Sequence, residues 1–166
     1  MEFLKANEED RAVITALYKS AIGSMGCTWN DDYPSLEHTK SDMARDGLFC
    51  LKNESGEIIG AISIDDDAQV EELPCWSKNG AELARLVVKE EYQNQGIAGL
   101  LLRKAMEVLK QRGYAYVHFL VSKEHTKALR AYEKLNFDKV GECNLYNGNW
   151  WCYEKTLTNK SETMLN

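Results

Sequence analysis

The chain has 166 residues, of which 44% are hydrophobic and 28% charged, and its formal net charge is −6 at pH 7. This length and composition predict a single soluble globular domain over residues 1–166. The negative charge argues against nucleic-acid binding, and no apolar stretch is long enough to span a membrane. Because the N-terminus lacks the apolar core of a secretion signal, we expect a cytoplasmic location and no membrane association.

The five cysteines include no C-x-x-C pair. An odd number without such spacing argues against a disulfide framework and against a zinc site. We therefore expect reduced thiols, and the sequence indicates no metal site.

The first half of the chain predicts a strand, two helices and a hairpin. The first helix has an apolar stripe of Val13, Ile14, Leu17 and Ala21. It should end at Gly23 and Gly26, and the segment from Asp65 to Gly80 is expected to be irregular. The other expected elements are a strand at 2–6, the cap of the first helix at Asn7, a helix from Ser35 to Asp46, and hairpin strands at Leu48–Lys52 and Ile58–Ile64.

The second half predicts alternating strands and helices. Tyr114–Val121 is apolar at nearly every position, which is typical of a strand buried on both faces in a parallel pairing. The strand-helix-strand unit at 81–121 should therefore be parallel, within a mixed sheet that has helices on both faces. The other expected elements are a strand at 81–88, a helix that runs to about Arg112, a helix at Thr126–Leu135, and a last hairpin of Phe137–Cys143 and Trp150–Leu157.

A polar turn, Gln93-Asn94-Gln95-Gly96-Ile97-Ala98, lies between the strand at 81–88 and the helix that follows. The first N–H groups of a helix have no partner inside the helix, and the helix dipole adds positive charge at the same end. Such a turn favours a phosphate or diphosphate group. The Lys-Ser/Thr pair of nucleotide hydrolases and the three glycines of dinucleotide-binding folds are both missing.

The turn instead fits the pattern Q/R-x-x-G-x-G/A through Gln93, Gly96 and Ala98, and it resembles the coenzyme A signature of the GNAT superfamily of N-acetyltransferases. A second stretch, 128–137, resembles the family's segment of alanine, then tyrosine, then Leu-Gly-Phe. The order of elements is similar as well. The resemblance implies an α/β (α+β) fold with a mixed, mostly antiparallel central sheet, one parallel strand pair, and helices on both faces.

The resemblance also implies acetyl-CoA as the cofactor. In the family, the strand before the turn carries a bulge, and its main chain pairs with the pantetheine arm much like an added strand. His125 stands where the family often has an asparagine that contacts the cofactor. The implied cofactor-binding residues are Leu86, Val87 and Val88 for the arm, and Gln93, Asn94, Gln95, Gly96, Ile97, Ala98 and Gly99 for the diphosphate, together with His125.

For catalysis, the resemblance implies that Tyr132 donates a proton to the departing thiolate. An ordinary tyrosine pKa of about 10 keeps the phenol protonated at neutral pH. Glu82 is the candidate general base, and Glu71, Glu72 or ordered water alone stay open as alternatives. His118 lies in a predicted buried strand, where we expect a hydrogen-bonded core histidine rather than a ligand.

The acceptor is expected to be a small-molecule amine, and the aromatic residues Trp29, Tyr33 and Trp76 in the irregular segments are candidates to line its pocket. A protein N-acetyltransferase and a non-catalytic acyl-CoA-binding module are the alternatives. The resemblance leaves a homodimer through the last strands open.

Overall fold

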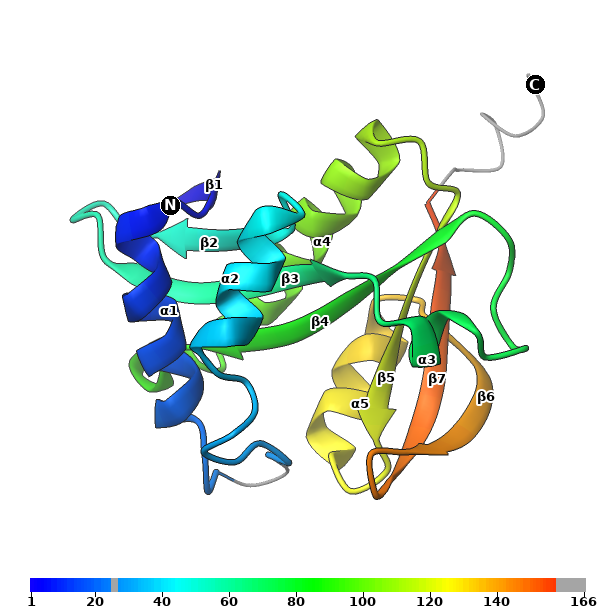
Figure 1. Ribbon diagram of the computed structural model, residues 1–166. Helices are drawn as coiled ribbons and strands as arrows, with labels where there is room; N and C mark the ends of the chain where they lie inside the picture. The colour runs from blue at the N-terminus through cyan, green and yellow to red at the C-terminus, as the bar shows by residue number, and fades with distance from the viewer. Residues whose placement is uncertain (25–26, 158–166) are drawn as a thin grey trace. The chain divides into compact units, whose positions relative to one another are not determined.

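The computed structural model describes residues 1–24 and 27–157 (Figure 1). The elements follow the predicted order, with two short helices added. They are β1 (Glu2–Lys5), α1 (Glu8–Ser20), α2 (Leu36–Ala44), β2 (Leu48–Lys52), β3 (Ile58–Asp65), α3 (Ala68–Glu71), β4 (Gly80–Val88), the 3₁₀ helix η1 (Glu90–Tyr92), α4 (Ile97–Gln111), β5 (Tyr116–Ser122), α5 (Thr126–Lys134), β6 (Asp138–Leu145) and β7 (Gly148–Thr156).

The strands form one mixed sheet in the order β1-β2-β3-β4-β5-β7-β6. The β1–β2, β2–β3, β5–β7 and β6–β7 pairs are antiparallel. The β4–β5 pair is parallel, and its register joins Gly80–Glu82 to Tyr116–His118. The predicted fold class and the predicted parallel unit are therefore confirmed.

The chain divides into two compact units, Met1–Asp65 with Ala84–Ala105, and Asp66–Leu83 with Met106–Asn166. Both β4 and α4 contribute residues to each unit. The single domain expected from composition stays a prediction.

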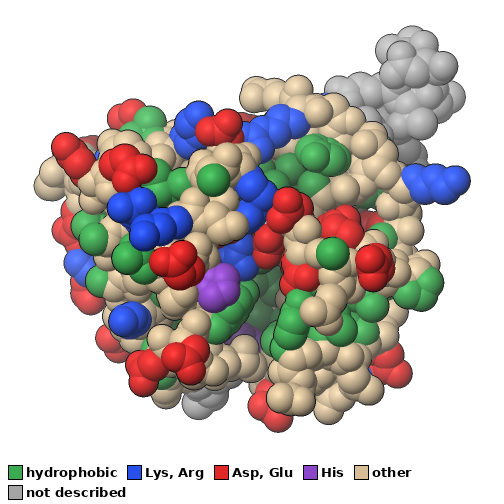
Figure 2. Space-filling view, in the orientation of Figure 1, with side chains coloured by type: hydrophobic (Ala, Val, Ile, Leu, Met, Phe, Trp, Pro, Cys, Tyr) green, Lys and Arg blue, Asp and Glu red, His purple; other side chains and the backbone are tan. Residues whose placement is uncertain are grey.

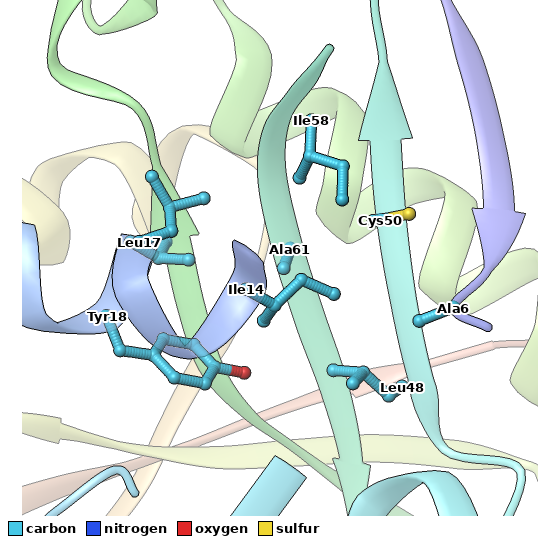
Figure 3. Close-up of a cluster of buried hydrophobic side chains, with 9 residues drawn as sticks. Ala6, Ile14, Leu17, Tyr18, Leu48, Cys50, Ile58 and Ala61 are labelled. Atoms are coloured by element: carbon cyan, nitrogen blue, oxygen red, sulfur yellow. The ribbon is translucent and has the colours of Figure 1, made fainter. Parts of the chain in front are cut away.

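The first unit has a core between α1 and the strands β2 and β3 (Figure 3). Ile14 and Tyr18 of α1 are fully buried, together with Leu48 and Ala61 of the strands. Val13, which the apolar stripe placed inward, is 50% exposed, because the helix presents Tyr18 to the core instead. Asn7 caps α1 in a capping box with Asp10.

Helix α1 ends at Ser20, before Gly23, which has a positive φ of 86°. Gly26, the other glycine expected to end this helix, lies outside the described residues.

The other face of β3 packs against the first turns of α4, and Figure 1 shows α4 behind β3 while α1 and α2 lie in front. Gly60 makes this contact possible: an added Cβ would lie 2.8 Å from Leu101 Cδ1 and 3.0 Å from the Val87 carbonyl oxygen. Leu101 is fully buried. The absence of a side chain at Gly60 therefore allows α4 to lie close against β3.

We expect Gly60→Ala to destabilise the fold by about 1–3 kcal/mol, because the added methyl group overpacks a contact that includes main chain. The free energy of unfolding in urea measures the loss. Ser55→Ala, at an exposed position of the β2–β3 turn, should stay within about 0.5 kcal/mol of the wild type. Equal stability of Gly60→Ala and the wild type would mean that α4 moves freely on β3.

The second unit packs α5 on one face of the β5–β7–β6 strands and the segment 66–80 on the other. Phe119 of β5 and Tyr153 of β7 are opposite each other in the sheet, and their side chains lie on the face that packs against α5. Their ring centroids lie 6.1 Å apart. The segment 66–80, expected to be irregular, contains the short helix α3. The N-cap Asp67 of α3 accepts a hydrogen bond from the Gln69 N–H at 3.0 Å.

All five cysteines are free. Cys143 and Cys152 lie on the last hairpin, but the register pairs them with Trp150 and Gly141, so they are not directly opposite each other. Cys75 packs on Gly141, where an added Cβ would lie 3.1 Å from the Cys75 Cβ atom. Burial raises the pKa of the Cys143 and Cys152 thiols.

Acidic and basic side chains are interspersed over the face shown in Figure 2. In the part of the chain that the structure describes, no helix has both the length and the apolar character needed to cross a membrane. Within the same residues, no group of three or more His, Cys, Asp and Glu side chains is placed to hold a metal ion.

Candidate functional site

The turn before α4 has the backbone that an anion site requires. Asn94 and Gly96 have positive φ values of 62° and 82°. The Gly96 carbonyl accepts the N–H of Leu100 at 3.1 Å, so the helical bonds begin there. An added Cβ at Gly96 would meet no atom within 4 Å, so its lack of a side chain is needed for the backbone conformation and not for packing.

The residues predicted for the diphosphate lie together at this turn. Gln93, Asn94, Gln95 and Gly96 are exposed, whereas Ile97 is buried and anchors the helix. The Gln93 side chain donates a hydrogen bond to the Val88 carbonyl at 3.0 Å. The turn is therefore tied to the end of β4, and the main-chain N–H groups at the start of α4 remain the natural donors to an anion.

The second half of β4 contains a backbone irregularity at Arg85, whose φ is 51°. Of the cofactor-arm residues that follow it, Val87 is buried in the core of the first unit and Leu86 and Val88 are half-buried. The Lys89 N–H returns to the Ile59 carbonyl at 2.8 Å. The backbone of β4 therefore departs from regular strand geometry at Arg85, and the bulge that the resemblance implied stays a prediction.

The Arg85 side chain is buried among charged groups. Its Nε and Nη2 atoms donate to the two oxygens of Asp42 at 3.0 and 2.7 Å, and Nη1 donates to Asp65 at 2.9 Å. Asp42 also pairs with Arg45 and accepts from Ser63 Oγ at 2.7 Å. Burial alone would lower the pKa of the Arg85 guanidinium, but Asp42 and the other anionic neighbours outweigh it and raise that pKa.

Two of the predicted acceptor-side aromatics belong to the first unit. Trp29 packs edge-on against Tyr18, with ring centroids 5.4 Å apart. The Tyr33 hydroxyl accepts a hydrogen bond from Arg85 Nη1 at 3.1 Å, and its ring lies 4.7 Å from that of His38. Tyr33 is 38% exposed, so part of the ring is open to a ligand.

Tyr132 lies in the second unit, on the face of α5 that packs on β5. Its ring centroid lies 4.6 Å from Phe119 and 6.4 Å from Tyr153. Burial raises the pKa of its phenol to about 12. His125 caps the same helix, and its Nδ1 accepts the Ala128 N–H at 3.3 Å.

Glu82 lies in a row of three buried ionisable side chains. The register pairs Glu82 with His118 and His118 with Glu154, so all three side chains lie on one face of the β4, β5 and β7 strands. Glu154 accepts hydrogen bonds from the Ser77 N–H and Oγ–H, both at 2.7 Å. The segment 66–80 is thereby held over this face.

The same segment supplies the partners of His118. Its Nε2 atom lies 2.8 Å from Glu71 Oε1, and the Trp76 ring stacks on the imidazole with centroids 4.3 Å apart. His118 is 1% exposed, and its Nδ1 atom has no hydrogen-bond partner among the described residues. The expectation of a fully hydrogen-bonded core histidine is therefore wrong for one of the two ring nitrogens.

Arg85, Asp42, Asp65 and Glu154 were missed at the sequence level. A lone arginine within an apolar strand pattern was the available signal, since such a charge is rarely buried without a partner. The sequence contains several acidic candidates, so the partners could be identified only from the fold.

Comparisons with known proteins point to one family. Residues 14–137 match the family model described as acetyltransferase (GNAT) family. Human N-acetyltransferase 8B is 30% identical over 108 residues, an alignment that covers 63% of this chain and 44% of that protein. This chain thus spans less than half the length of that curated relative.

Solved structures share the fold. A ribosomal-protein-alanine N-acetyltransferase from Brucella melitensis has a TM-score of 0.75 at 17% identity, covering 94% of this chain and 99% of that one. A Salmonella typhimurium protein, described as an acetyltransferase and solved with its cofactor acetyl-CoA, has a TM-score of 0.73 at 16% identity, covering 96% and 95%. With the family model matching well over half of its residues, the chain belongs to the GNAT acetyltransferase family.

Proposed function

We propose that this chain is an acetyl-CoA-dependent N-acetyltransferase that moves the acetyl group directly from the thioester to a primary amine. The observation that carries the proposal is the exposed turn in which Asn94 and Gly96 take positive φ and open α4. A helix N-terminus of this form favours a diphosphate. An added Cβ at Gly96 would meet no protein atom within 4 Å, so no side chain blocks the approach of a ligand to the turn.

Within the first unit, N–H groups from Asn94 to Gly99 hold the diphosphate, and the main chain of Leu86–Val88 holds the pantetheine arm. The Gln93 side chain contributes by bracing the turn against Val88. His125 keeps its proposed cofactor contact through Nε2, because Nδ1 is engaged in capping α5.

Acetyl-CoA supplies the acetyl thioester. Glu82 accepts a proton from the ammonium form of the acceptor, so that the nitrogen can attack. A main-chain N–H of Leu86–Val88 donates to the oxyanion that develops on the carbonyl oxygen. As the C–S bond breaks, Tyr132 would donate its phenolic proton to the sulfur, and the second proton that the nitrogen loses on becoming an amide would return to the phenolate through solvent.

The acceptor is proposed to be a small-molecule amine that contacts Trp29, Tyr33 and Trp76. The neighbour from Brucella melitensis is described as acting on a ribosomal protein, which keeps a protein N-terminus as the second candidate. Free thiols suit a reducing compartment such as the cytoplasm. A homodimer through β6 and β7 stays a prediction.

The test is release of coenzyme A thiol when the protein meets acetyl-CoA and a panel of polyamines, aminoglycosides, amino acids and peptides. Amine-dependent release supports the proposal, and the accepting class names the acceptor. Tight binding of coenzyme A in calorimetry without release across the panel would instead support a non-catalytic acyl-CoA-binding module. Absence of binding would contradict both.

The base can be assigned by three glutamine substitutions. We expect Glu82→Gln to lower kcat/KM by about 10²-fold or more, because the amide cannot accept the proton, and to remove the acidic limb of the pH–rate profile. Glu71→Gln and Glu72→Gln should stay within a few fold of the wild type. A larger loss in Glu71→Gln would move the role to Glu71, and three unchanged profiles would leave ordered water as the base.

A further inference from the structure

The backbone of Arg85 has a conformation that residues with a side chain rarely adopt. Among the described residues, Arg85 is the non-glycine residue that has a positive φ inside a strand. The other non-glycine residues with positive φ lie in turns or beside the ends of helices and strands. A non-glycine residue in the left-handed region is strained, and the conformation persists only where surrounding contacts impose it. The structure therefore has to supply contacts that hold this residue.

Those contacts are the ion pairs with Asp42 and Asp65. The guanidinium meets Asp42 through two parallel hydrogen bonds, the arrangement that fixes direction as well as distance. It meets Asp65 at the end of β3 through a third. The side chains of Arg85 and Asp42 are 4% and 1% exposed, so the pairs are shielded from water.

The charged groups of the cluster are directed at one another. The donors of Arg85 already point to Asp42, Asp65 and the Tyr33 hydroxyl. Asp42 and Asp65 are balanced by Arg85 and Arg45, which also pairs with both carboxylates. Charged groups that pair with one another in this way fix the geometry of the main chain that carries them.

The conformation of Arg85 affects the main chain directly after it, at Leu86–Val88. A residue in the left-handed region inside a strand bends the strand and re-aims the groups after it. We propose that Arg85, held by Asp42 and Asp65, is a positioning residue that directs the main-chain groups of Leu86–Val88 toward the pantetheine arm of coenzyme A. This inference rests on the proposed function, and it adds the device that shapes the arm site.

The test compares two ligands by calorimetry: coenzyme A, and 3′-phosphoadenosine 5′-diphosphate, which is coenzyme A without the pantetheine arm. Arg85→Lys keeps the charge but loses the paired hydrogen bonds. We expect it to weaken coenzyme A binding at least tenfold and to change binding of the armless nucleotide less than twofold. A general loss of structure would weaken both ligands alike.

Two further variants complete the test. Asp65→Asn, at the partly exposed rim of the cluster, is less disruptive to folding and should give the same selective loss in smaller degree. In Arg85→Gly, residue 85 can adopt positive φ without strain but has no side chain to bond Asp42 and Asp65. We therefore expect this variant to lose coenzyme A affinity as Arg85→Lys does. Lys89→Gln, which breaks the exposed pairs with Glu57 and Glu91 and leaves the Arg85 contacts in place, is the control and should bind both ligands normally.

Equal losses for the two ligands, or wild-type coenzyme A affinity in Arg85→Gly, would overturn the positioning role. Failure of the wild-type chain to bind either ligand would instead contradict the proposed function itself.

Discussion

Gly96→Asp is expected to abolish coenzyme A binding, with a loss of at least 100-fold in affinity. The carboxylate would lie in the open space over the turn, where the diphosphate is proposed to bind. Two like charges about 4 Å apart repel by about 4 kcal/mol near a protein surface, which exceeds the 2.7 kcal/mol that a 100-fold loss represents. Isothermal calorimetry with coenzyme A measures the effect.

Gly96→Asn is the matched control, because asparagine has nearly the same shape as aspartate and tolerates positive φ, as Asn94 does beside it. We expect Gly96→Asn to lose affinity by about tenfold at most, through crowding alone. If both variants bind coenzyme A like the wild type, the diphosphate does not lie on this turn.

Tyr132→Phe is expected to lower kcat by about 10²-fold or more, while the Kd for coenzyme A changes less than threefold. The phenylalanine ring keeps the contacts with Phe119 and Tyr153 and removes only the hydroxyl. General acid catalysis contributes about 10²–10⁴-fold to rates. Steady-state turnover with a reactive amine, together with calorimetry, separates the two effects.

Tyr153→Phe provides the control, since Tyr153 belongs to the same aromatic cluster and its hydroxyl donates only a long bond of 3.4 Å to Glu133. It should keep full turnover. Because burial raises the pKa of Tyr132 to about 12, the wild-type rate should show no alkaline loss from this group below about pH 11. Unchanged turnover of Tyr132→Phe across pH would remove Tyr132 from the mechanism.

Local sequence patterns predicted the helices and strands well, because the spacing of hydrophobic residues and the capping of helices depend on only a few neighbouring residues. The capping box of Asn7 with Asp10 and the parallel pairing of 80–82 with 116–118 are both present. The short helix α3 was missed because it has a single turn with one buried apolar residue, Val70. One apolar residue cannot show the periodic spacing that identifies a helix in a sequence.

The charged partners could not be predicted in the same way. Asp42 and Arg85 are 43 positions apart, and Glu71 and His118 are 47 apart, so each pair depends on how the strands and helices pack. Val13 illustrates the limit on a helix face: it fits the apolar stripe, yet the fold turns it to solvent. The turn at 93–96 and the start of α4 at Ile97 could be predicted because both belong to one continuous segment.

The buried thiols have a practical consequence for measuring this activity. A chromogenic disulfide reagent reports free coenzyme A by reacting with thiolates, and protein thiols compete for it. Burial raises the pKa of Cys50 to about 11, and it raises the pKa values of Cys143 and Cys152 as well. Cys50 and Cys152 are buried as well, so they should add little background colour, and replacing the half-buried Cys27, Cys75 and Cys143 by serine would give a protein suited to continuous recording.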